Sequence, residues 1–345
     1  GIPRRNPKHF HLYRTKEEAT NMAKKAEFGL TLANRGVVIG VTTVEEMLQM
    51  SEIADASDVY DWVWVGDSIL AKPRLEAVAL LSAVAARTKK LKMGPACMAS
   101  MALRHPITLA TQWASLDLIS AGRTVFVACT GLGSADKMGK EARTYHMERK
   151  DRAPRMEEQI EIFKRLWTED HVSFKGDYYN FEDVTVEPKP AQKPRPPIWI
   201  AHAHKGIPKF IERARRRTAR MADGYMAAQG HPEEYRATLD AISGYMREYG
   251  RDPNTLSTAL YYNININEDR QAAFEESTRF LNAYYMTNFK PEVVESWLAY
   301  GSPEQCIAKL RQYIDVGIKM ITMRLTGWDQ MGLLKRCVEE VLPFM

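Results

Sequence analysis

Two histidines and a lysine lie close together in the segment His202-Ala-His-Lys-Gly206, directly after the short apolar run Ile198-Trp-Ile-Ala201. Imidazole groups contact anions or move protons near neutral pH. The start of a helix offers unpaired N–H groups and a positive dipole, to which a lysine adds charge. The segment therefore predicts an anion site, with His202 and His204 as candidate catalytic groups and Ala203, Lys205 and Gly206 as candidate binding residues. The alternative is that both histidines are loop residues facing water.

One long segment shows how the chain positions such groups. Residues 104–123 indicate a helix, because Pro106 suits a first helical position, apolar side chains recur on one face and Gly122 ends it. The apolar run Leu91–Met98 precedes this helix. The run Thr124–Thr130 follows it and is too short and too β-branched to be helical. The segment is therefore a strand–helix–strand unit with parallel strands.

The same alternation continues along the chain. The expected strands are Glu27–Leu32, Trp62–Gly66, Leu91–Met98, Thr124–Thr130, Ile198–Ala201, Gly224–Ala228, Ser257–Ile264 and Lys319–Arg324. Helices are expected between them, among them Arg74–Thr88, Arg152–Trp167, Ile207–Met221, Pro232–Tyr249 and Gln330–Leu342. Eight such units predict an α/β fold, the (β/α)8 TIM barrel, with its active site at the carboxyl ends of the strands. The competing fold is a doubly wound sheet, which the missing Gly-rich first turn disfavours.

The domain organisation expected from this pattern is simple. Residues 1–25 form a basic N-terminal extension, and residues 26–345 form a single barrel domain. A hairpin insertion of about residues 171–196 precedes strand five, where prolines and turn residues interrupt the rhythm. A helical insertion of about residues 268–300 precedes strand eight, because this segment is longer than one crossover needs.

Composition and charge narrow the function classes. The chain has 345 residues, of which 45% are hydrophobic, and a formal net charge of +5. No apolar run approaches membrane-spanning length and no signal-peptide pattern is present, so we expect a cytoplasmic protein without a membrane partner. The arginines between Arg213 and Arg220 are expected to lie on a solvated helix face, not to bind nucleic acid. The cysteines lack metal-ligand spacing, so we expect no metal site and free thiols at Cys97 and Cys129.

The residues that follow the strands should meet at one rim. There we expect a common cavity faced by Asp67, Cys97, Thr130, His202, Gln229 and Arg324. Aromatic pairs divide into two kinds. Trp62 and Trp64 are expected to be packing residues, whereas Tyr284 and Tyr285 lie in the second insertion and are candidates to roof a substrate pocket.

Several segments occur in a specific order, namely Trp64–Asp67, Arg104–Pro106, Leu116–Arg123, Arg155–Glu158, Leu166–Trp167, Phe174–Tyr179, Pro188–Pro194, Pro197–Ile200 and Ala222–Gly224. Together they resemble the bacterial luciferase-like family of flavin-dependent oxidoreductases over roughly residues 26–342. The resemblance implies FMN, supplied in reduced form by a separate NAD(P)H:flavin reductase, or the 5-deazaflavin coenzyme F420. Either cofactor binds in the mouth of the barrel. A homodimer is also expected.

The resemblance implies roles for single positions. The peptide bond between Ala96 and Cys97 matches a family cis bond that supports the flavin ring from behind; the alternative is that both are merely small strand residues. Ser68 stands where many relatives have a catalytic histidine, and a serine forms hydrogen bonds but has no useful pKa near neutrality. The cofactor-binding residues expected in all are Asp67, Ala96, Cys97, Thr130, Gly131, Arg155, Ala203, Lys205, Gly206, Gln229 and Gly230.

Two of these positions carry alternatives. Arg155 matches a family arginine near the flavin phosphate, but an ion pair with Glu158 or Glu161 on its own helix is the favoured interpretation. In deazaflavin-dependent sugar-phosphate dehydrogenases of the family, a glutamate follows the glycine after strand four. This chain has Leu132 after Gly131, which disfavours that specific activity.

The main functional prediction is a monooxygenase that uses reduced FMN and O2 on a small organic substrate. The first alternative is a deazaflavin-dependent dehydrogenase or reductase that transfers hydride. A non-catalytic flavin-binding protein is a second alternative, because Ser68 and Leu132 replace two catalytic groups of relatives. A non-redox barrel that binds a phosphate ligand is a third.

Overall fold

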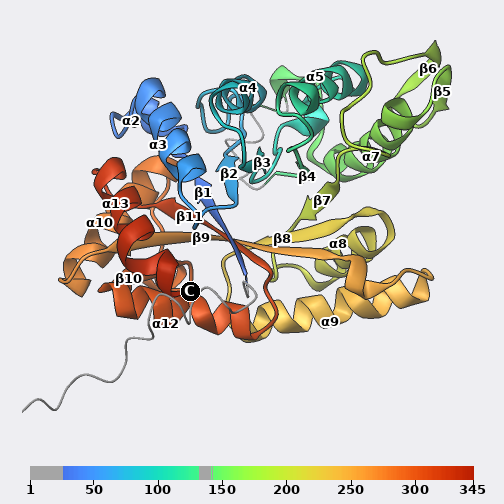
Figure 1. The fold of residues 1–345 in the computed structure, drawn as a ribbon. Helices are drawn as coiled ribbons and strands as arrows, with labels where there is room; N and C mark the ends of the chain where they lie inside the picture. The colour runs from blue at the N-terminus through green and yellow to red at the C-terminus, as the bar shows by residue number, and fades with distance from the viewer. Residues whose placement is uncertain (1–25, 132–140, 142) are drawn as a thin grey trace, which may run out of the picture.

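The computed structural model describes residues 26–131, 141 and 143–345, so the predicted N-terminal extension and Leu132 lie outside the described residues. Eight parallel strands form its centre (Figure 1). They are β1 (Glu27–Thr31), β2 (Trp62–Val65), β3 (Lys92–Pro95), β4 (Phe126–Ala128), β7 (Ile198–Ala201), β8 (Gly224–Ala228), β9 (Ser257–Ile266) and β11 (Met320–Leu325). Every expected strand is present, and the boundaries differ by a few residues.

The strands close into a barrel. Their order is β3-β2-β1-β11-β9-β8-β7-β4, so each strand pairs with its sequence neighbours in the barrel series. Parallel bridges Met93↔Thr124 and Met98↔Ala128 join β3 to β4, the two ends of this order. The prediction of a (β/α)8 barrel is therefore confirmed.

Helices cover the outside of the barrel (Figure 1). The principal ones are α3 (Val44–Ala56), α4 (Ala77–Arg87), α5 (Pro106–Ile119), α7 (Arg152–Thr168), α8 (Pro208–Met221), α9 (Pro232–Glu248), α12 (Pro303–Asp315) and α13 (Gln330–Arg336). Their starts follow local chemistry, since Thr43 accepts the N–H of Glu46 and Ser302 forms a capping box with Gln305. The final helix is shorter than expected, because a π-helical turn, η4 (Cys337–Val341), and a 3-10 turn, η5 (Leu342–Phe344), replace its second half.

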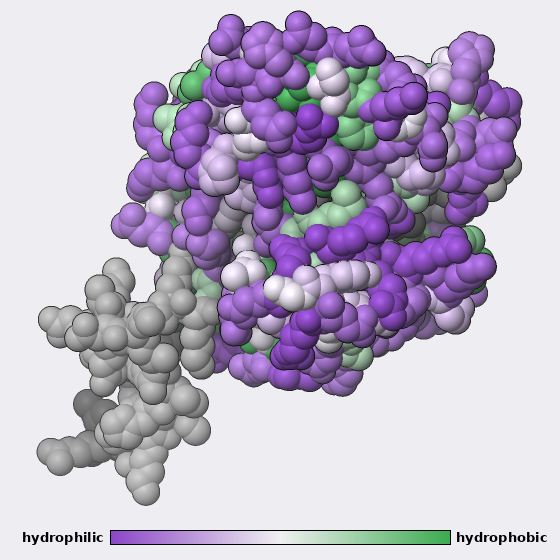
Figure 2. Space-filling model, turned by 90° about the vertical axis from the view of Figure 1, so that its right-hand side faces the viewer, coloured by the Kyte–Doolittle hydropathy of each residue, from purple (hydrophilic) through white to green (hydrophobic). Residues whose placement is uncertain are grey.

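Short helices complete the connections. They are α2 (Gly36–Ile39), η1 (Met101–Leu103), η2 (Arg149–Asp151) and η3 (Pro253–Thr255). Among the described residues, none of the helices combines the length and the apolar character needed to cross a membrane. The basic helix α8 has a solvated face, as expected, with Arg216 paired to Glu212 and Arg217 paired to Glu157. The side of the molecule shown in Figure 2 is mostly hydrophilic, with small apolar areas between.

Both insertions are present. The first contains the antiparallel hairpin of β5 (Val172–Lys175) and β6 (Asn180–Val184), which lies at the edge of the molecule beside α7 (Figure 1). The second contains α10 (Arg270–Tyr285) and α11 (Pro291–Glu295), but it is not wholly helical as expected. It ends in a short strand, β10 (Leu298–Gly301), which pairs in parallel with the outer part of the long strand β9. β8 pairs with β9 only as far as Tyr261, so the rest of β9 leaves an edge on that side, on which β10 pairs.

Tryptophans fill the barrel interior toward the amino ends of the strands. The rings of Trp62 and Trp64 stack at 5.2 Å, and Trp199 lies 5.6 Å from Trp62, which confirms that the first two are packing residues. Glycines on neighbouring strands make the space for these rings. A Cβ on Gly29 would lie 2.7 Å from the Trp64 indole nitrogen, and one on Gly224 would lie 2.5 Å from the Trp199 ring. The interior is therefore a packed core at this level and has no channel along its axis.

Gly94 tests this packing. We expect Gly94→Ala to lower the free energy of unfolding by about 1–3 kcal/mol, because its Cβ would lie 2.5 Å from the carbonyl oxygen of Val125. The matched control is Gly244→Ala in α9, where no atom lies within 4 Å of the added Cβ. That change should raise stability by roughly 0.5–1 kcal/mol. Urea denaturation measures both. Equal effects of the two substitutions would contradict the packing account.

Candidate functional site

The carboxyl ends of the barrel strands form a rim with a small-residue floor. Residues two apart on a strand face the same side, so the residues that follow Trp64 and Trp199 at this spacing point inward. These inward positions are Gly66 and Ala201. Gly94 and Gly224 lie against the tryptophan rings, so Ala96 and Ala228, at spacings of two and four residues from them, point inward as well. Above the tryptophans the barrel is therefore lined by small residues, and the Arg74 guanidinium occupies the space beside Gly66.

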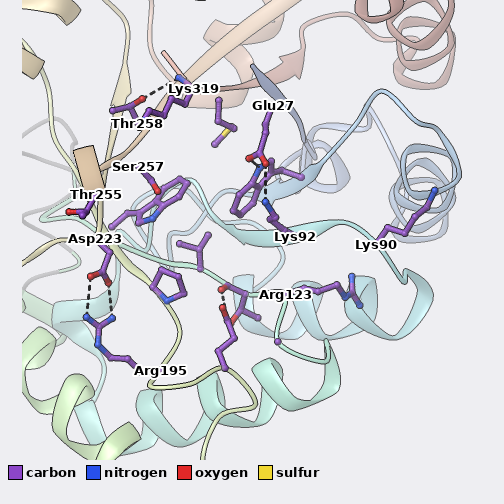
Figure 3. A pocket seen from close by; sticks show the side chains of 18 of the residues that line it. Glu27, Lys90, Lys92, Arg123, Arg195, Asp223, Thr255, Ser257, Thr258 and Lys319 are labelled. Atoms are coloured by element: carbon purple, nitrogen blue, oxygen red, sulfur yellow. Dashed lines mark hydrogen bonds and ion pairs between the residues drawn. The ribbon is translucent and has the colours of Figure 1, made fainter. Parts of the chain in front are cut away.

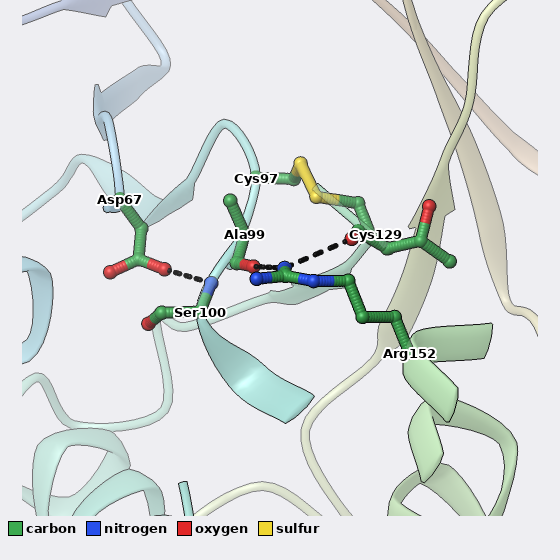
Figure 4. Close-up of a disulfide and its surroundings, with 7 residues drawn as sticks. Asp67, Cys97, Ala99, Ser100, Cys129 and Arg152 are labelled. Atoms are coloured by element: carbon green, nitrogen blue, oxygen red, sulfur yellow. Dashed lines mark hydrogen bonds between the residues drawn. A yellow bond between two sulfur atoms is a disulfide. The ribbon is translucent and has the colours of Figure 1, made fainter. Parts of the chain in front are cut away.

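A buried ion pair organises the loops on one side of this rim. Arg152 at the start of α7 lies 3.1 Å from a carboxylate oxygen of Glu141, and their side chains are each 4% exposed. Arg152 also donates to the backbone carbonyl of Ala99, after β3, and to that of Thr130, after β4, each at 3.2 Å (Figure 4). The guanidinium thus joins two strand-end loops. Sequence reasoning missed Arg152, because an arginine at a helix start carries no signal of such tertiary contacts.

The other carboxylate oxygen of Glu141 reaches a third loop. It accepts the backbone N–H of Leu70 at 2.9 Å and that of Ala71 at 3.2 Å, both after β2. In the same loop the Ser68 hydroxyl accepts the N–H of Lys72 at 2.9 Å. The predicted site residue Ser68 therefore holds the loop in shape, and its role toward a substrate stays a prediction.

Asp67 also holds a loop. Its carboxylate accepts the N–H of Ser100 at 2.7 Å and lies 3.2 Å from Arg104, which donates to the Ser100 hydroxyl as well. Burial raises the pKa of Asp67, and the charge of Arg104 and the bonds from Ser100 oppose this rise. Asp67 thus lies at the rim, but both of its carboxylate oxygens contact other protein groups. Binding of a cofactor by this residue stays a prediction.

Cys97 and Cys129 form a disulfide, which corrects the expectation of free thiols (Figure 4). The two residues follow β3 and β4, and barrel closure brings their Cα atoms to 6.1 Å, within the range a disulfide spans. The sequence places them 32 residues apart and gives no sign of this approach. Cys306 and Cys337 are free and buried. The peptide bond between Ala96 and Cys97 is cis, as the family resemblance implies.

The predicted anion loop lies where β7 meets α8. The His202 ring lies 4.5 Å from the Tyr225 ring, and His204 contacts Tyr225 and Tyr235 edge-on. Each histidine uses its Nδ1 atom, His202 with the carbonyl of Ala203 and His204 with the Thr238 hydroxyl, both at 3.1 Å. Each Nε2 atom is buried without a hydrogen-bond partner among the described residues. Both residues are partly exposed, but neither Nε2 atom reaches water, so the water-facing alternative is contradicted for these ring atoms and not for the side chains as a whole.

Burial lowers the pKa of His202 and of His204 to about 4. Both are therefore neutral at pH 7. A neutral imidazole donates one hydrogen bond and accepts another, but it carries no charge to balance an anion. Because both rings pack against Tyr225 instead of meeting over the barrel axis, a hydrogen-bonding role fits them better than proton transfer. Their catalytic role stays a prediction.

The start of α8 borders a hollow of about 620 Å³, lined by His204, Lys205, Gly206, Pro208, Lys209, Ile211, Glu212 and Arg215. Lys205 is exposed and pairs with Glu234 of α9 at 2.6 Å. The loop after β8 adjoins this hollow, since a Cβ on Gly230 would lie 3.0 Å from the His204 ring. Gln229 and Gly230 both have positive φ, 64° and 95°, which turns the chain toward the His204 loop. The structure thus brings these predicted residues together.

Arg155 lies apart from that loop. Its guanidinium lies 5.1 Å from the Tyr178 ring, at the hairpin insertion, and its Nε atom is buried without a partner. Glu158 instead accepts the backbone N–H groups of Asp177, Tyr178 and Tyr179. In the part of the chain that the structure describes, Arg155 forms no ion pair with Glu158 or Glu161, so that favoured interpretation is wrong. A role of Arg155 at a cofactor phosphate stays a prediction.

The far side of the rim holds Arg324 among three tyrosines. It is 1% exposed, donates to the Tyr285 hydroxyl at 2.8 Å and lies 4.1 Å from the Tyr284 ring. The Tyr285 hydroxyl is also 2.8 Å from that of Tyr261. The second insertion therefore covers this part of the mouth through α10, as expected for Tyr284 and Tyr285. Arg324 follows the prediction that strand-end residues meet at one rim. The His202 ring instead packs on the Tyr225 ring, 4.5 Å away.

A larger cavity, of about 900 Å³, opens at the amino ends of the strands (Figure 3). Two ion pairs lie in it, Lys92 with Glu27 at 2.9 Å and Arg195 with Asp223 at 2.7 Å. Chemistry in this fold is located at the opposite, carboxyl rim. We therefore do not place the functional site in the larger cavity. The described residues contain no cluster suited to a metal ion.

The fold and rim define a class: a (β/α)8 barrel enzyme with a small-residue floor beside a basic helix start. The luciferase-like monooxygenase model matches residues 26–320. The chain belongs to this family and is an oxidoreductase of it. A relative from Kineococcus radiotolerans, an F420-dependent glucose-6-phosphate dehydrogenase, is 25% identical over 312 residues, covering 83% of this chain and 88% of the relative.

Two solved structures share the fold. An F420-dependent secondary alcohol dehydrogenase, in complex with an F420-acetone adduct, superposes with a TM-score of 0.77 at 16% identity, covering 93% of this chain and 100% of that one. A monooxygenase from Streptomyces bottropensis superposes with a TM-score of 0.75 at 23% identity, covering 92% and 99%. At these identities the likeness establishes the barrel alone.

The lowered histidine pKa values predict a pH dependence of stability. Between pH 6.5 and about 4, His202 and His204 are protonated in the unfolded chain but not in the folded chain. Stability is therefore fully present above pH 6.5 and falls as the pH drops toward 4. We expect the double variant His202→Asn/His204→Asn to lose less unfolding free energy than the wild type between pH 7 and pH 5. Equal losses in urea denaturation would contradict the assignment.

The buried ion pair predicts a large mutational effect. We expect Glu141→Gln to lower the free energy of unfolding by about 3–5 kcal/mol, because Arg152 would remain as an uncompensated buried charge. The control is Glu52→Gln, which removes the exposed partner of Arg87 and should cost less than about 1 kcal/mol. Similar losses for the two variants in denaturant titrations would show that the buried pair does not hold the loops.

Proposed function

We propose that the chain is a deazaflavin-dependent oxidoreductase that transfers hydride between coenzyme F420 and a small organic substrate. This function is the first alternative of the sequence analysis, whose main prediction is an FMN-dependent monooxygenase. The observation that carries it is the similarity to F420-dependent glucose-6-phosphate dehydrogenases over 83% of the chain. A second such relative, from Amycolatopsis mediterranei, is 27% identical over 312 residues, which supports the same choice.

The residues at the rim fit a cofactor of this shape. The small inward residues Ala96, Ala201 and Ala228 suit a flat ring system above the tryptophans, beside the Arg74 guanidinium that lies against Gly66. The N–H groups at the start of α8, with Lys205 nearby, suit a phosphate. The unpartnered Nε2 atoms of His202 and His204 are buried polar groups that a ligand oxygen would satisfy. The same loop therefore supplies charge, dipole and hydrogen bonds to one anionic group.

The substrate is proposed to differ from glucose 6-phosphate. Ser68 stands where many relatives have a catalytic histidine, and Leu132 stands where the deazaflavin-dependent sugar-phosphate dehydrogenases have a glutamate. A serine hydroxyl with a pKa far above neutrality does not replace the proton transfer of a histidine. An alcohol or carbonyl compound that is oriented by other groups of this rim fits the residues better.

The protein's part in the reaction is binding and orientation. The cofactor, when bound, supplies the atom that accepts or donates hydride. The loop at residues 202–206 and the start of α8 hold its anionic end, while the loops joined by Arg152 and Glu141 enclose the ring. The hydroxyls of Tyr261 and Tyr285 bond to each other at 2.8 Å on the opposite side of the mouth, beside Arg324, which leaves one O–H to donate to a substrate oxygen there. Burial raises the pKa of Tyr261 well above its usual value, so it remains a donor at neutral pH.

The FMN monooxygenase remains the second candidate, because a monooxygenase structure superposes with a TM-score of 0.75. That function would need reduced FMN, O2 and a separate flavin reductase. Purified protein incubated with F420 and a panel of secondary alcohols should lose absorbance at the cofactor's visible band. Protein given reduced FMN should consume O2 no faster than free reduced FMN. Oxygenated product without F420 turnover would replace the proposal by the second candidate, and cofactor binding without either turnover would support a carrier.

Lys205 provides a test of cofactor placement. We expect Lys205→Glu to weaken F420 binding several-fold, because it puts a negative charge beside the cofactor phosphate at the start of α8. The substitution also replaces the ion pair with Glu234 by repulsion. Lys89→Glu, an exposed change at the amino end of the barrel, serves as the control with wild-type affinity. Fluorescence titration at low salt measures both dissociation constants. Unchanged affinity in Lys205→Glu would place the phosphate elsewhere.

A further inference from the structure

Arg324 is a buried cation inside the barrel mouth. It is 1% exposed and lies next to the last residue of β11. It faces the same side as Thr322, whose hydroxyl meets that of Thr31 at 2.7 Å inside the barrel. Its Nη1 atom donates to Tyr285, but its Nε atom is buried and has no hydrogen-bond partner. The guanidinium therefore keeps at least one unsatisfied hydrogen-bond donor at a place from which water is largely excluded.

Aromatic rings, not carboxylates, surround this charge. The guanidinium carbon of Arg324 lies 4.1 Å from the centre of the Tyr284 ring, 5.0 Å from that of Tyr261 and 5.7 Å from that of Tyr285. Among the described residues, Arg324 takes part in no ion pair. Cation–π contacts return less free energy than burying an ion costs. The site thus lacks a counter-ion.

Two further arginines converge on Tyr284. The guanidinium of Arg74 lies 5.4 Å from the Tyr284 ring, with Nη1 at 3.5 Å from its hydroxyl. The backbone N–H of Arg35 donates to the same hydroxyl at 3.4 Å, and the Arg35 Nε atom is buried without a partner. Burial and the charge of Arg74 lower the pKa of Arg35. Across residues 26–131 and 143–345, neither arginine is paired with a carboxylate. The Arg35 guanidinium itself donates to the Pro73 carbonyl at 2.5 Å. Within the described residues, the three arginines at this edge of the mouth therefore have carbonyl, hydroxyl and ring contacts but no carboxylate partner.

Gly66 and Asn34 allow the arginines to approach Tyr284. A Cβ on Gly66 would lie 2.1 Å from the Arg74 guanidinium, so glycine at the end of β2 lets that group approach the mouth. Asn34 fixes the neighbouring loop by donating to the carbonyls of Gly66 and Leu75 at 2.7 and 3.0 Å. It also accepts the Tyr284 hydroxyl at 3.1 Å. The arginines are therefore held in place by contacts from β1, β2 and α10.

We propose that Arg324, together with Arg74 and Arg35, binds an oxyanion group of the substrate: a carboxylate, phosphate or sulfonate. This rests on the proposed function, which makes the mouth a substrate site. The cofactor phosphate is assigned to the loop after β7, whereas β11, which carries Arg324, and β1, which precedes Arg35, lie three and four strands away from β7 in the ring. The arginines therefore serve a second anion. The substrate is an acid whose charged group lies under α10, while its reacting carbon lies over the small-residue floor.

The test is sulfate binding by the purified full-length protein, measured by isothermal titration calorimetry at constant ionic strength with chloride as the replaced anion. Charge-assisted hydrogen bonds from arginine are strong, so we expect Arg324→Met to weaken sulfate binding about tenfold or more. Arg324→Lys should keep most of the affinity because it keeps the charge. Titrations with acetate, inorganic phosphate and methanesulfonate then identify which oxyanion the site prefers.

The control is Arg87→Met, an exposed arginine of α4 that pairs with Glu45 and Glu52 and should leave sulfate binding unchanged. Equal sulfate affinity in wild type and Arg324→Met, or no sulfate binding by the wild type, would overturn the inference. If Arg324→Met does not fold, Arg74→Met replaces it, with at least threefold weaker binding expected and unchanged affinity overturning the inference. Arg324-dependent sulfate binding without any F420 binding would refute the proposed function alone. F420 binding with Arg324-independent sulfate binding would refute this inference alone.

Discussion

The ion pair between Arg152 and Glu141 is the interaction on which the functional rim depends. The two side chains are almost fully buried and together contact the loops after β2, β3 and β4. A buried pair of this kind is costly to break, because either charge alone would remain without solvent or partner. It therefore fixes the relative positions of three loops that the barrel strands only deliver to the same end. The disulfide between Cys97 and Cys129 joins two of the same loops covalently.

Charge is distributed around the mouth on two opposite sides. One side presents the start of α8 with Lys205 and two neutral histidines, which suits a single phosphate. The other presents Arg324 with no carboxylate beside it in the described chain, under the tyrosines of α10. Between them the strands end in small residues. This arrangement is the basis for our proposal that a flat cofactor is anchored at one side and an acidic substrate at the other.

The fold was largely predictable from the sequence, and the site only in part. Strand and helix periodicity is a local property, so segments such as residues 104–123 predict their structure and the barrel follows from their count. Contacts between loops are not local. The approach of Cys97 to Cys129, the role of Arg152 and the packing of His202 on Tyr225 depend on barrel closure and on burial, which leave no trace in spacing. The proximity of Lys205 and Gly230 was predictable because both residues follow strands of the barrel, and their role in binding stays a prediction.

The most direct test of the account is a crystal structure of the protein soaked with coenzyme F420. The account predicts electron density for the deazaflavin ring at the carboxyl rim over Ala96 and Ala201, with its phosphate at the start of α8. Density in the larger cavity at the amino ends, beside Trp62 and Lys92, would contradict it, because that end would then hold the chemistry.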